Sequence, residues 1–103
     1  MWAEQVVCQY FQKNNYRLMA QRYKIQGVEI DLVFNKNQDW LLVEVKYLDN
    51  LWRAGERVSQ KQIQRLQKTH QYIKFNRKIK QMMFLVALVE KNKKIHWINL
   101  ADY

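Results

Sequence analysis

Two segments separated by a short polar turn decide the fold: GVEIDLVFNK at residues 27–36 and DWLLVEVKYL at residues 39–48. Apolar side chains stand at every second position from residue 28 to residue 34, as in a β-strand that buries one face. The alternation predicts one face of Val28, Ile30, Leu32 and Phe34 and another of Glu29, Asp31 and Val33. The second segment is rich in Leu and Val and predicts a strand over residues 40–47. Between the two, Asn37-Gln38 predicts a two-residue turn with Lys36 opposite Asp39.

This register predicts a concentration of charge on one side of the hairpin. It places Asp31 opposite Glu44 and Glu29 opposite Lys46, and because side chains alternate along a strand, all four share a side. Two carboxylates directly across a strand pair repel, and a conflict of this kind usually has a function. A divalent cation would relieve the repulsion. Mg²⁺ prefers oxygen ligands and is often held by one or two carboxylates together with water and substrate phosphate.

The candidate metal ligands are therefore Asp31, Glu44 and the main-chain carbonyl of Val45. Lys46 would point toward the same water, where it could orient a hydroxide or stabilise negative charge on a phosphate. The alternative is a half-exposed sheet with solvent-facing charges, in which Glu29 and Lys46 form an ordinary cross-strand ion pair. Spacing alone leaves both interpretations open.

The rest of the chain predicts helices packed on one sheet. The expected elements are a helix at residues 2–13 that stops at Asn14-Asn15, a weak strand at 16–25, a basic helix at 57–75, a strand buried on both sides at 82–89 and a last strand at 95–100. The order αβββαββ is typical of an α+β or mixed α/β domain. With 103 residues, no proline and no low-complexity segment, we expect one domain over residues 1–103.

Composition narrows the functional classes. The chain has 18 Lys and Arg against 9 Asp and Glu, a net charge of +9 that favours a polyanionic partner such as nucleic acid. One cysteine and two histidines cannot build a zinc finger. The longest apolar run, residues 82–89, is too short to span a membrane. A lone cysteine and a first segment unlike a signal peptide favour the cytoplasm.

Candidate nucleic-acid contacts lie after the hairpin. Arg57, Lys61, Arg65 and Lys68 have helical spacing, so they could follow a phosphate backbone; the alternative is a solvated helix face. Trp52-Arg53 is a candidate for insertion at a branch or a distorted base step, but the favoured role of Trp52 is to cover the core. The remaining chemistry-bearing side chains are assigned to packing: Cys8, His70 and His96.

The spacing of the acidic residues resembles a known nuclease pattern. Asp31, then twelve residues, then Glu44-Val45-Lys46, after one helix and before a basic one, resembles the PD-(D/E)XK nuclease superfamily. The closer resemblance is to the small bacterial YraN-like family, itself similar to archaeal Holliday-junction resolvases. That family's pattern of a first-helix Glu, a Glu-Ile-Asp-Leu strand, a Val-Glu-Val-Lys strand and a later helix Lys is matched here by Glu4, residues 29–32, residues 43–46 and Lys61.

The resemblance implies a restriction-endonuclease-like fold and metal-assisted hydrolysis of DNA, including branched or Holliday-junction DNA. It implies Mg²⁺ or Mn²⁺ on Asp31 and Glu44, catalytic roles for Lys46 and Glu4, and a phosphate contact from Lys61. The alternative for Glu4 is a carboxylate favoured by the helix dipole. The second hypothesis is a non-catalytic nucleic-acid-binding module that keeps the nuclease fold. A homodimer would let two sites face two phosphates.

Three positions depart from the pattern. Val28 separates Gly27 from Glu29, Asn15 stands where a Gly is usual, and Leu48 stands where an Arg often follows the Glu-x-Lys strand. None of these departures removes a candidate metal ligand.

Overall fold

The computed structural model describes residues 2–25, 27–48, 60–77 and 81–100. Its elements, in chain order, are α1 (Trp2–Lys13), β1 (Arg17–Ile25), β2 (Val28–Lys36), β3 (Asp39–Leu48), α3 (Gln60–Arg77), β4 (Gln81–Glu90) and β5 (Ile95–Asn99). This order confirms the predicted αβββαββ arrangement. Trp52, Arg53 and Arg57 lie outside the described residues.

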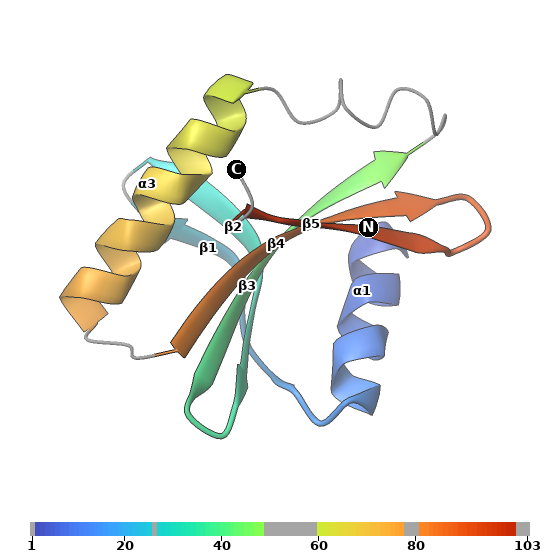
Figure 1. Ribbon diagram of the computed structural model, residues 1–103. Helices are drawn as coiled ribbons and strands as arrows, with labels where there is room; N and C mark the ends of the chain where they lie inside the picture. The colour runs from blue at the N-terminus through green and yellow to red at the C-terminus, as the bar shows by residue number, and fades with distance from the viewer. Residues whose placement is uncertain (1, 26, 49–59, 78–80, 101–103) are drawn as a thin grey trace.

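One five-stranded mixed sheet lies between helices α1 and α3 (Figure 1). The strands are ordered β1-β2-β3-β4-β5, and only β3 and β4 run parallel. Parallel neighbours need a long crossover, which α3 provides on one face of the sheet. Each face carries its own apolar cluster, one including Ile63, Leu66 and Ile73 of α3 and the other including Ala3, Val7 and Phe11 of α1.

The β2–β3 hairpin has the predicted register. Lys36 pairs with Asp39, and the ladder continues to Leu32 paired with Val43. Asn37 has a positive φ of 58° and Gln38 does not, which are the φ signs of a type II′ hairpin turn, and Asn tolerates a positive φ better than most non-glycine residues. The turn chemistry therefore sets which residues face each other further along the strands.

The end of α1 explains one departure from the family pattern. Asn15 has φ 69°, its N–H donates to the Gln12 carbonyl at 3.1 Å, and the Tyr16 N–H donates to the Phe11 carbonyl at 3.0 Å. These two bonds form a Schellman motif, whose left-handed position takes Gly most often and Asn next. Asn15 thus ends the helix where a Gly is usual.

The predicted two-faced alternation of β2 is wrong in one respect. As predicted, Leu32 and Phe34 share one face, in the cluster on the α1 side of the sheet. Ile30, however, packs on the opposite face, in the cluster on the α3 side that also contains Val33. The change of side occurs where β2 leaves its ladder with β3. Because helices cover both faces, alternation here separates two apolar layers rather than core from solvent, and Val33 is buried too.

The strand predicted at residues 82–89 is confirmed as buried on both sides over its second half. Val86 and Leu88 pack on the α3 side, and Ala87 and Val89 on the α1 side. Within the described ranges, no helix has the length and apolar character needed to cross a bilayer.

Candidate active site

The candidate site begins where β2 and β3 separate. Their ladder ends at Leu32 paired with Val43, and the next position along β2 is Asp31. At this position the Val45 N–H of β3 donates to the side chain of Asp31, at Oδ2 and 2.7 Å, instead of to a main-chain carbonyl of β2. β3 meanwhile continues beside β4 as far as Leu48. Divergence of the strands thus opens an edge of β3 that a carboxylate occupies.

Glu44 is the buried carboxylate of the site. Its side chain is 8% exposed and shares a hydrogen bond with Asp31. Burial raises the pKa of Glu44 to about 9, and the bond to Asp31 and the negative charges of Asp31 and Glu29 act in the same direction, whereas Lys46 lowers it. At neutral pH Glu44 therefore keeps its proton. The predicted proximity of Asp31 and Glu44 is confirmed.

Glu29 and Lys46 do not form the cross-strand ion pair that the alternative interpretation of the sequence predicts. Both influence the pKa of Glu44, so both lie near it. The ion pairs in the described part of the chain, however, join Arg22 to Glu4 and His96 to Glu90, and not Glu29 to Lys46. Glu29 is exposed and Lys46 half-buried, which leaves the ammonium on the side of the buried carboxylate.

The donor set fits a hard divalent cation. Asp31 and Glu44 supply carboxyl oxygens, and the proton that Glu44 keeps occupies the place of a positive charge. In a strand, the N–H and C=O of one residue face the same neighbour, so the Val45 carbonyl faces the side on which Asp31 lies. Two carboxylates and a carbonyl, completed by water and phosphate, suit Mg²⁺ or Mn²⁺. Among the described residues, no three His, Cys, Asp or Glu side chains form a metal cluster.

At the margin of the site, Glu4 contacts Arg22, a residue that the sequence analysis did not identify. Its carboxylate, 15% exposed in the first turn of α1, lies 3.8 Å from Arg22 Nη2. On β1, Gln21 pairs with Leu32 and Tyr23 with Ile30, which leaves Arg22 opposite Asp31. No sequence motif marks Arg22. Only its φ of 50°, which costs a non-glycine residue about 1–2 kcal/mol, distinguishes it.

Cys8, on the same helix, is a half-buried side chain packed against the α1-side cluster. Burial raises the pKa of its thiol, so the reactive thiolate is disfavoured. This confirms its assignment to packing.

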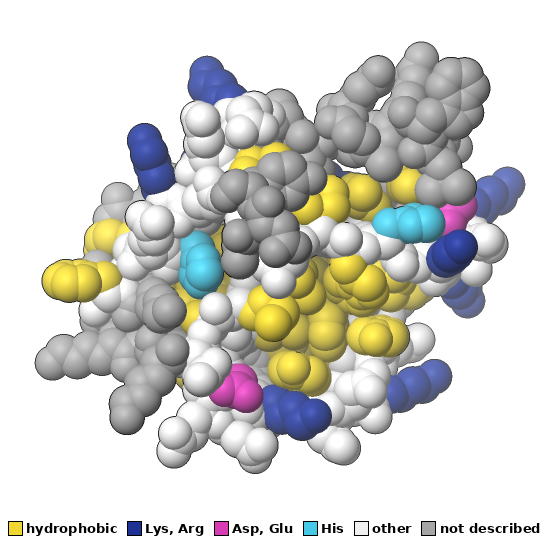
Figure 2. Space-filling view, in the orientation of Figure 1, with side chains coloured by type: hydrophobic (Ala, Val, Ile, Leu, Met, Phe, Trp, Pro, Cys, Tyr) yellow, Lys and Arg dark blue, Asp and Glu magenta, His cyan; other side chains and the backbone are white. Residues whose placement is uncertain are grey.

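The basic stripe of α3 faces solvent as predicted. Lys61, Arg65 and Lys68 are all exposed. Arg65 and Lys68 line a shallow cavity of about 320 Å³ that Tyr72 continues one helical turn further. In the view of Figure 2, Lys and Arg side chains stand around the periphery and hydrophobic side chains gather in the centre. Leu48, another departure from the family pattern, is buried in the α3-side cluster.

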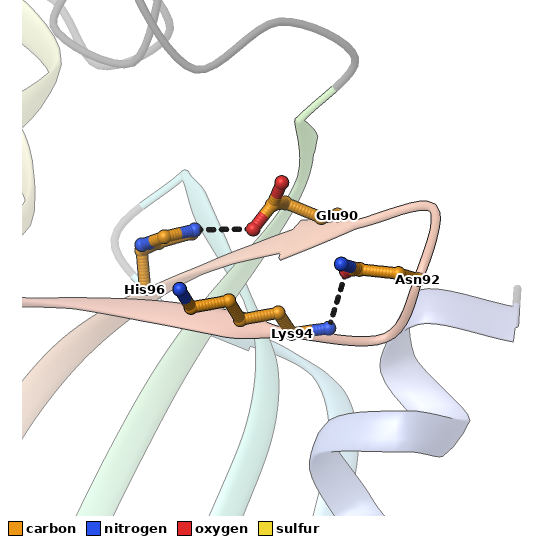
Figure 3. A network of polar contacts seen from close by, with 4 residues as sticks. All are labelled: Glu90, Asn92, Lys94 and His96. Atoms are coloured by element: carbon orange, nitrogen blue, oxygen red, sulfur yellow. Dashed lines mark hydrogen bonds and ion pairs between the residues drawn. The ribbon is translucent and has the colours of Figure 1, made fainter.

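The β4–β5 hairpin carries a second polar contact (Figure 3). His96 Nε2 lies 2.6 Å from Glu90 Oε2, and the Lys94 N–H donates to Asn92 Oδ1 at 3.0 Å. The assignment of His96 to packing is thus wrong, because cross-strand geometry gives it a carboxylate partner. Leu88 pairs with Lys46 on one side and His96 on the other, so both side chains lie on one face, with Cα atoms about 10 Å apart.

A mixed sheet between two helices, with Asp31 on β2 and Glu44 and Lys46 on β3, defines a restriction-endonuclease-like domain. The chain belongs to the uncharacterised protein family UPF0102, the YraN family, whose model matches residues 3–98. That family is part of the PD-(D/E)XK nuclease superfamily.

Relatives in distant bacteria share the domain. A UPF0102 protein of Vibrio parahaemolyticus is 30% identical over 95% of this chain and 86% of its own length. A UPF0102 protein of Idiomarina loihiensis is 26% identical over 96% of this chain and 91% of its own length. A UPF0102 protein of Thermotoga petrophila is 27% identical over 76% of this chain and 72% of its own length.

Proposed function

We propose that the protein is a Mg²⁺- or Mn²⁺-dependent endonuclease that hydrolyses phosphodiester bonds in DNA, including branched DNA such as Holliday junctions. The observation that carries the proposal is the carboxyl pair of half-buried Asp31 and buried Glu44, with Lys46 beside it. A buried carboxyl group that keeps its proton at neutral pH, beside a second carboxyl group, is suited to exchange that proton for a divalent cation.

Asp31, Glu44 and the Val45 carbonyl would hold the cation. A bound Mg²⁺ supplies charge stabilisation at the phosphate oxygens and makes water a better nucleophile. Glu44 would give up its proton on binding, because a neighbouring divalent charge favours the carboxylate. The ammonium of Lys46 would orient the attacking water and stabilise negative charge as it develops on the phosphate.

The surrounding charge supports a nucleic-acid substrate. The exposed Lys61, Arg65 and Lys68 follow one face of α3 at a spacing that suits successive phosphates. The net charge of +9 favours association with any polyanion and makes it sensitive to salt. For cutting both strands, a symmetric homodimer would supply two sites.

Asp31→Asn is expected to abolish metal-dependent cleavage, because the amide keeps the shape but removes a charged ligand. The assay follows linear, flapped and four-way DNA with Mn²⁺, with Mg²⁺ and with a chelator. Asp39→Asn is the matched control. Asp39 is an exposed carboxylate on β3, at the far side of the hairpin turn, and its loss should leave cleavage unchanged.

Two outcomes would overturn the proposal. If Asp31→Asn cleaves as well as the wild-type protein, the carboxyl pair has no catalytic role. If the wild-type protein cleaves none of the three substrates but binds them in a salt-sensitive, metal-independent way, the chain is a non-catalytic nucleic-acid-binding module.

A further inference from the structure

Arg22 has a backbone conformation that is unusual inside a β-strand. Four described non-glycine residues have positive φ, and three of them, Asn15, Asn37 and Lys93, lie at a helix end or in a turn. Arg22, at φ 50°, is the one inside a strand. Arginine is an unfavourable choice for the left-handed region, and such strain often accompanies a functional role.

The strained backbone turns the side chain of Arg22 toward α1. Successive residues of a regular strand point to opposite faces, but Gln21 and Arg22 line the same cavity beside α1. The next residue, Tyr23, packs on the α3 side. The left-handed residue therefore breaks the alternation of β1 and brings the guanidinium of Arg22 to the α1 side, at the position of β1 between the partners of Leu32 and Ile30.

The cavity at this position is polar and open. It measures about 290 Å³, roughly the volume of ten water molecules, and its wall includes Glu4, Gln5, Gln21, Arg22 and Leu32, the chain neighbour of Asp31. Amide groups of two glutamines and the guanidinium are the hydrogen-bond donors available there.

Arg22 is only loosely held by its partner in the protein. The Arg22 side chain is 62% exposed, and its separation of 3.8 Å from Glu4 is long for an ion pair. A pair with this long a separation and one largely exposed partner contributes little stability. A phosphate diester offers the guanidinium two oxygens in the geometry of its own N–H groups, which is a stronger interaction.

We propose that Arg22 is a phosphate-binding residue of the candidate active site, and that the cavity beside α1 receives a backbone phosphate of the DNA next to the one hydrolysed. This inference rests on the proposed function and adds to it a backbone contact from β1. It gives the substrate a second anchor, on the face of the sheet opposite the basic stripe of α3. Glu4 then acts as a positioning residue, which orients the guanidinium until the phosphate arrives.

The test compares Arg22→Gly with Lys93→Gly, measuring DNA affinity in a chelator, its salt dependence and thermal unfolding. Both variants remove one positive charge and one left-handed non-glycine residue, but Lys93 lies in the β4–β5 turn. Arg22→Gly should bind a DNA duplex about tenfold more weakly, with a salt slope lower by about 0.9, and Lys93→Gly should bind within twofold of wild type. Neither should lower the Tm, because glycine relieves the backbone strain.

Arg22→Asn is the second variant, since Asn accepts the left-handed region and loses only the charge. Equal weakening by Arg22→Gly and Lys93→Gly, or unchanged affinity in both Arg22 variants, would overturn the inference. Absence of wild-type DNA binding at low salt would overturn it as well. Because affinity is measured without metal, a wild-type protein that binds but never cleaves would defeat the nuclease proposal alone.

Discussion

Lys46→Met should lower the rate of metal-dependent DNA cleavage by about 10²- to 10⁴-fold, the usual effect of removing a proton-transferring or charge-stabilising group. Methionine keeps an unbranched chain of similar length and removes the ammonium. Lys46 lies two residues from Glu44 on β3 and lowers the pKa of Glu44, so its charge acts directly on the carboxyl pair. The measurement is the single-turnover cleavage rate at saturating Mn²⁺ and saturating protein.

Lys36→Met is the matched control for this prediction. Lys36 lies at the other end of the β2–β3 hairpin, with its ammonium 5.2 Å from the centroid of the Tyr16 ring. We expect its cleavage rate to stay within about twofold of wild type, because this cation–π contact contributes only about 0.5–1 kcal/mol to folding. DNA affinity should be nearly the same in both variants. A Lys46→Met protein that cleaves at close to the wild-type rate would exclude Lys46 from the chemistry.

Glu44→Gln should stabilise the metal-free protein at pH 8 by about 2–4 kcal/mol, which raises the Tm by about 10 °C or more. In the folded protein the pKa of Glu44 is about 9, above its ordinary value of 4.5. Between these values the folded state holds a proton that the unfolded state has lost, so the free energy of unfolding falls as the pH rises from about 4.5 to about 9. The glutamine amide resembles the protonated carboxyl and needs no proton.

Thermal unfolding at pH 5 and pH 8, with a chelator and with Mg²⁺, measures this effect. The wild-type protein should lose stability between the two pH values, and Mg²⁺ should restore it at pH 8 because binding compensates the buried charge. Glu44→Gln should be nearly independent of pH and respond less to Mg²⁺. The exposed-site variant Asp39→Asn should follow the wild type. A wild-type Tm that is equal at pH 5 and pH 8 in the chelator would contradict the shifted pKa of Glu44.

Local patterns made the centre of the fold predictable. Asn37-Gln38 can form a tight turn, and a tight turn fixes every cross-strand neighbour after it, so the register that brings Asp31 to Glu44 follows from the sequence. Asn15 ends α1 for an equally local reason. The stripe of Lys61, Arg65 and Lys68 follows from helical spacing, and its exposure is confirmed. In each case the information lies within one element or one turn.

Contacts between elements were not predictable in the same way. Alternation along β2 does not reveal that helices cover both faces, so the separation of Ile30 from Leu32 needed the packed sheet. The pairing of His96 with Glu90 depends on the register of β4 and β5. Neither residue lies in a motif, and each acquires its neighbour only when the strands assemble.

The sequence by itself determined the class of domain, the αβββαββ order and the two carboxylates that face each other, because periodicity, turn residues and charge are properties of short segments. Only the tertiary structure decided how strongly those carboxylates interact and what surrounds them. Burial of Glu44 between packed layers raises its pKa to about 9, and the left-handed backbone of Arg22 turns its guanidinium to the α1 side, 3.8 Å from the carboxylate of Glu4. Burial and strained φ values arise from packing elements that are distant in the chain, and no local pattern encodes them.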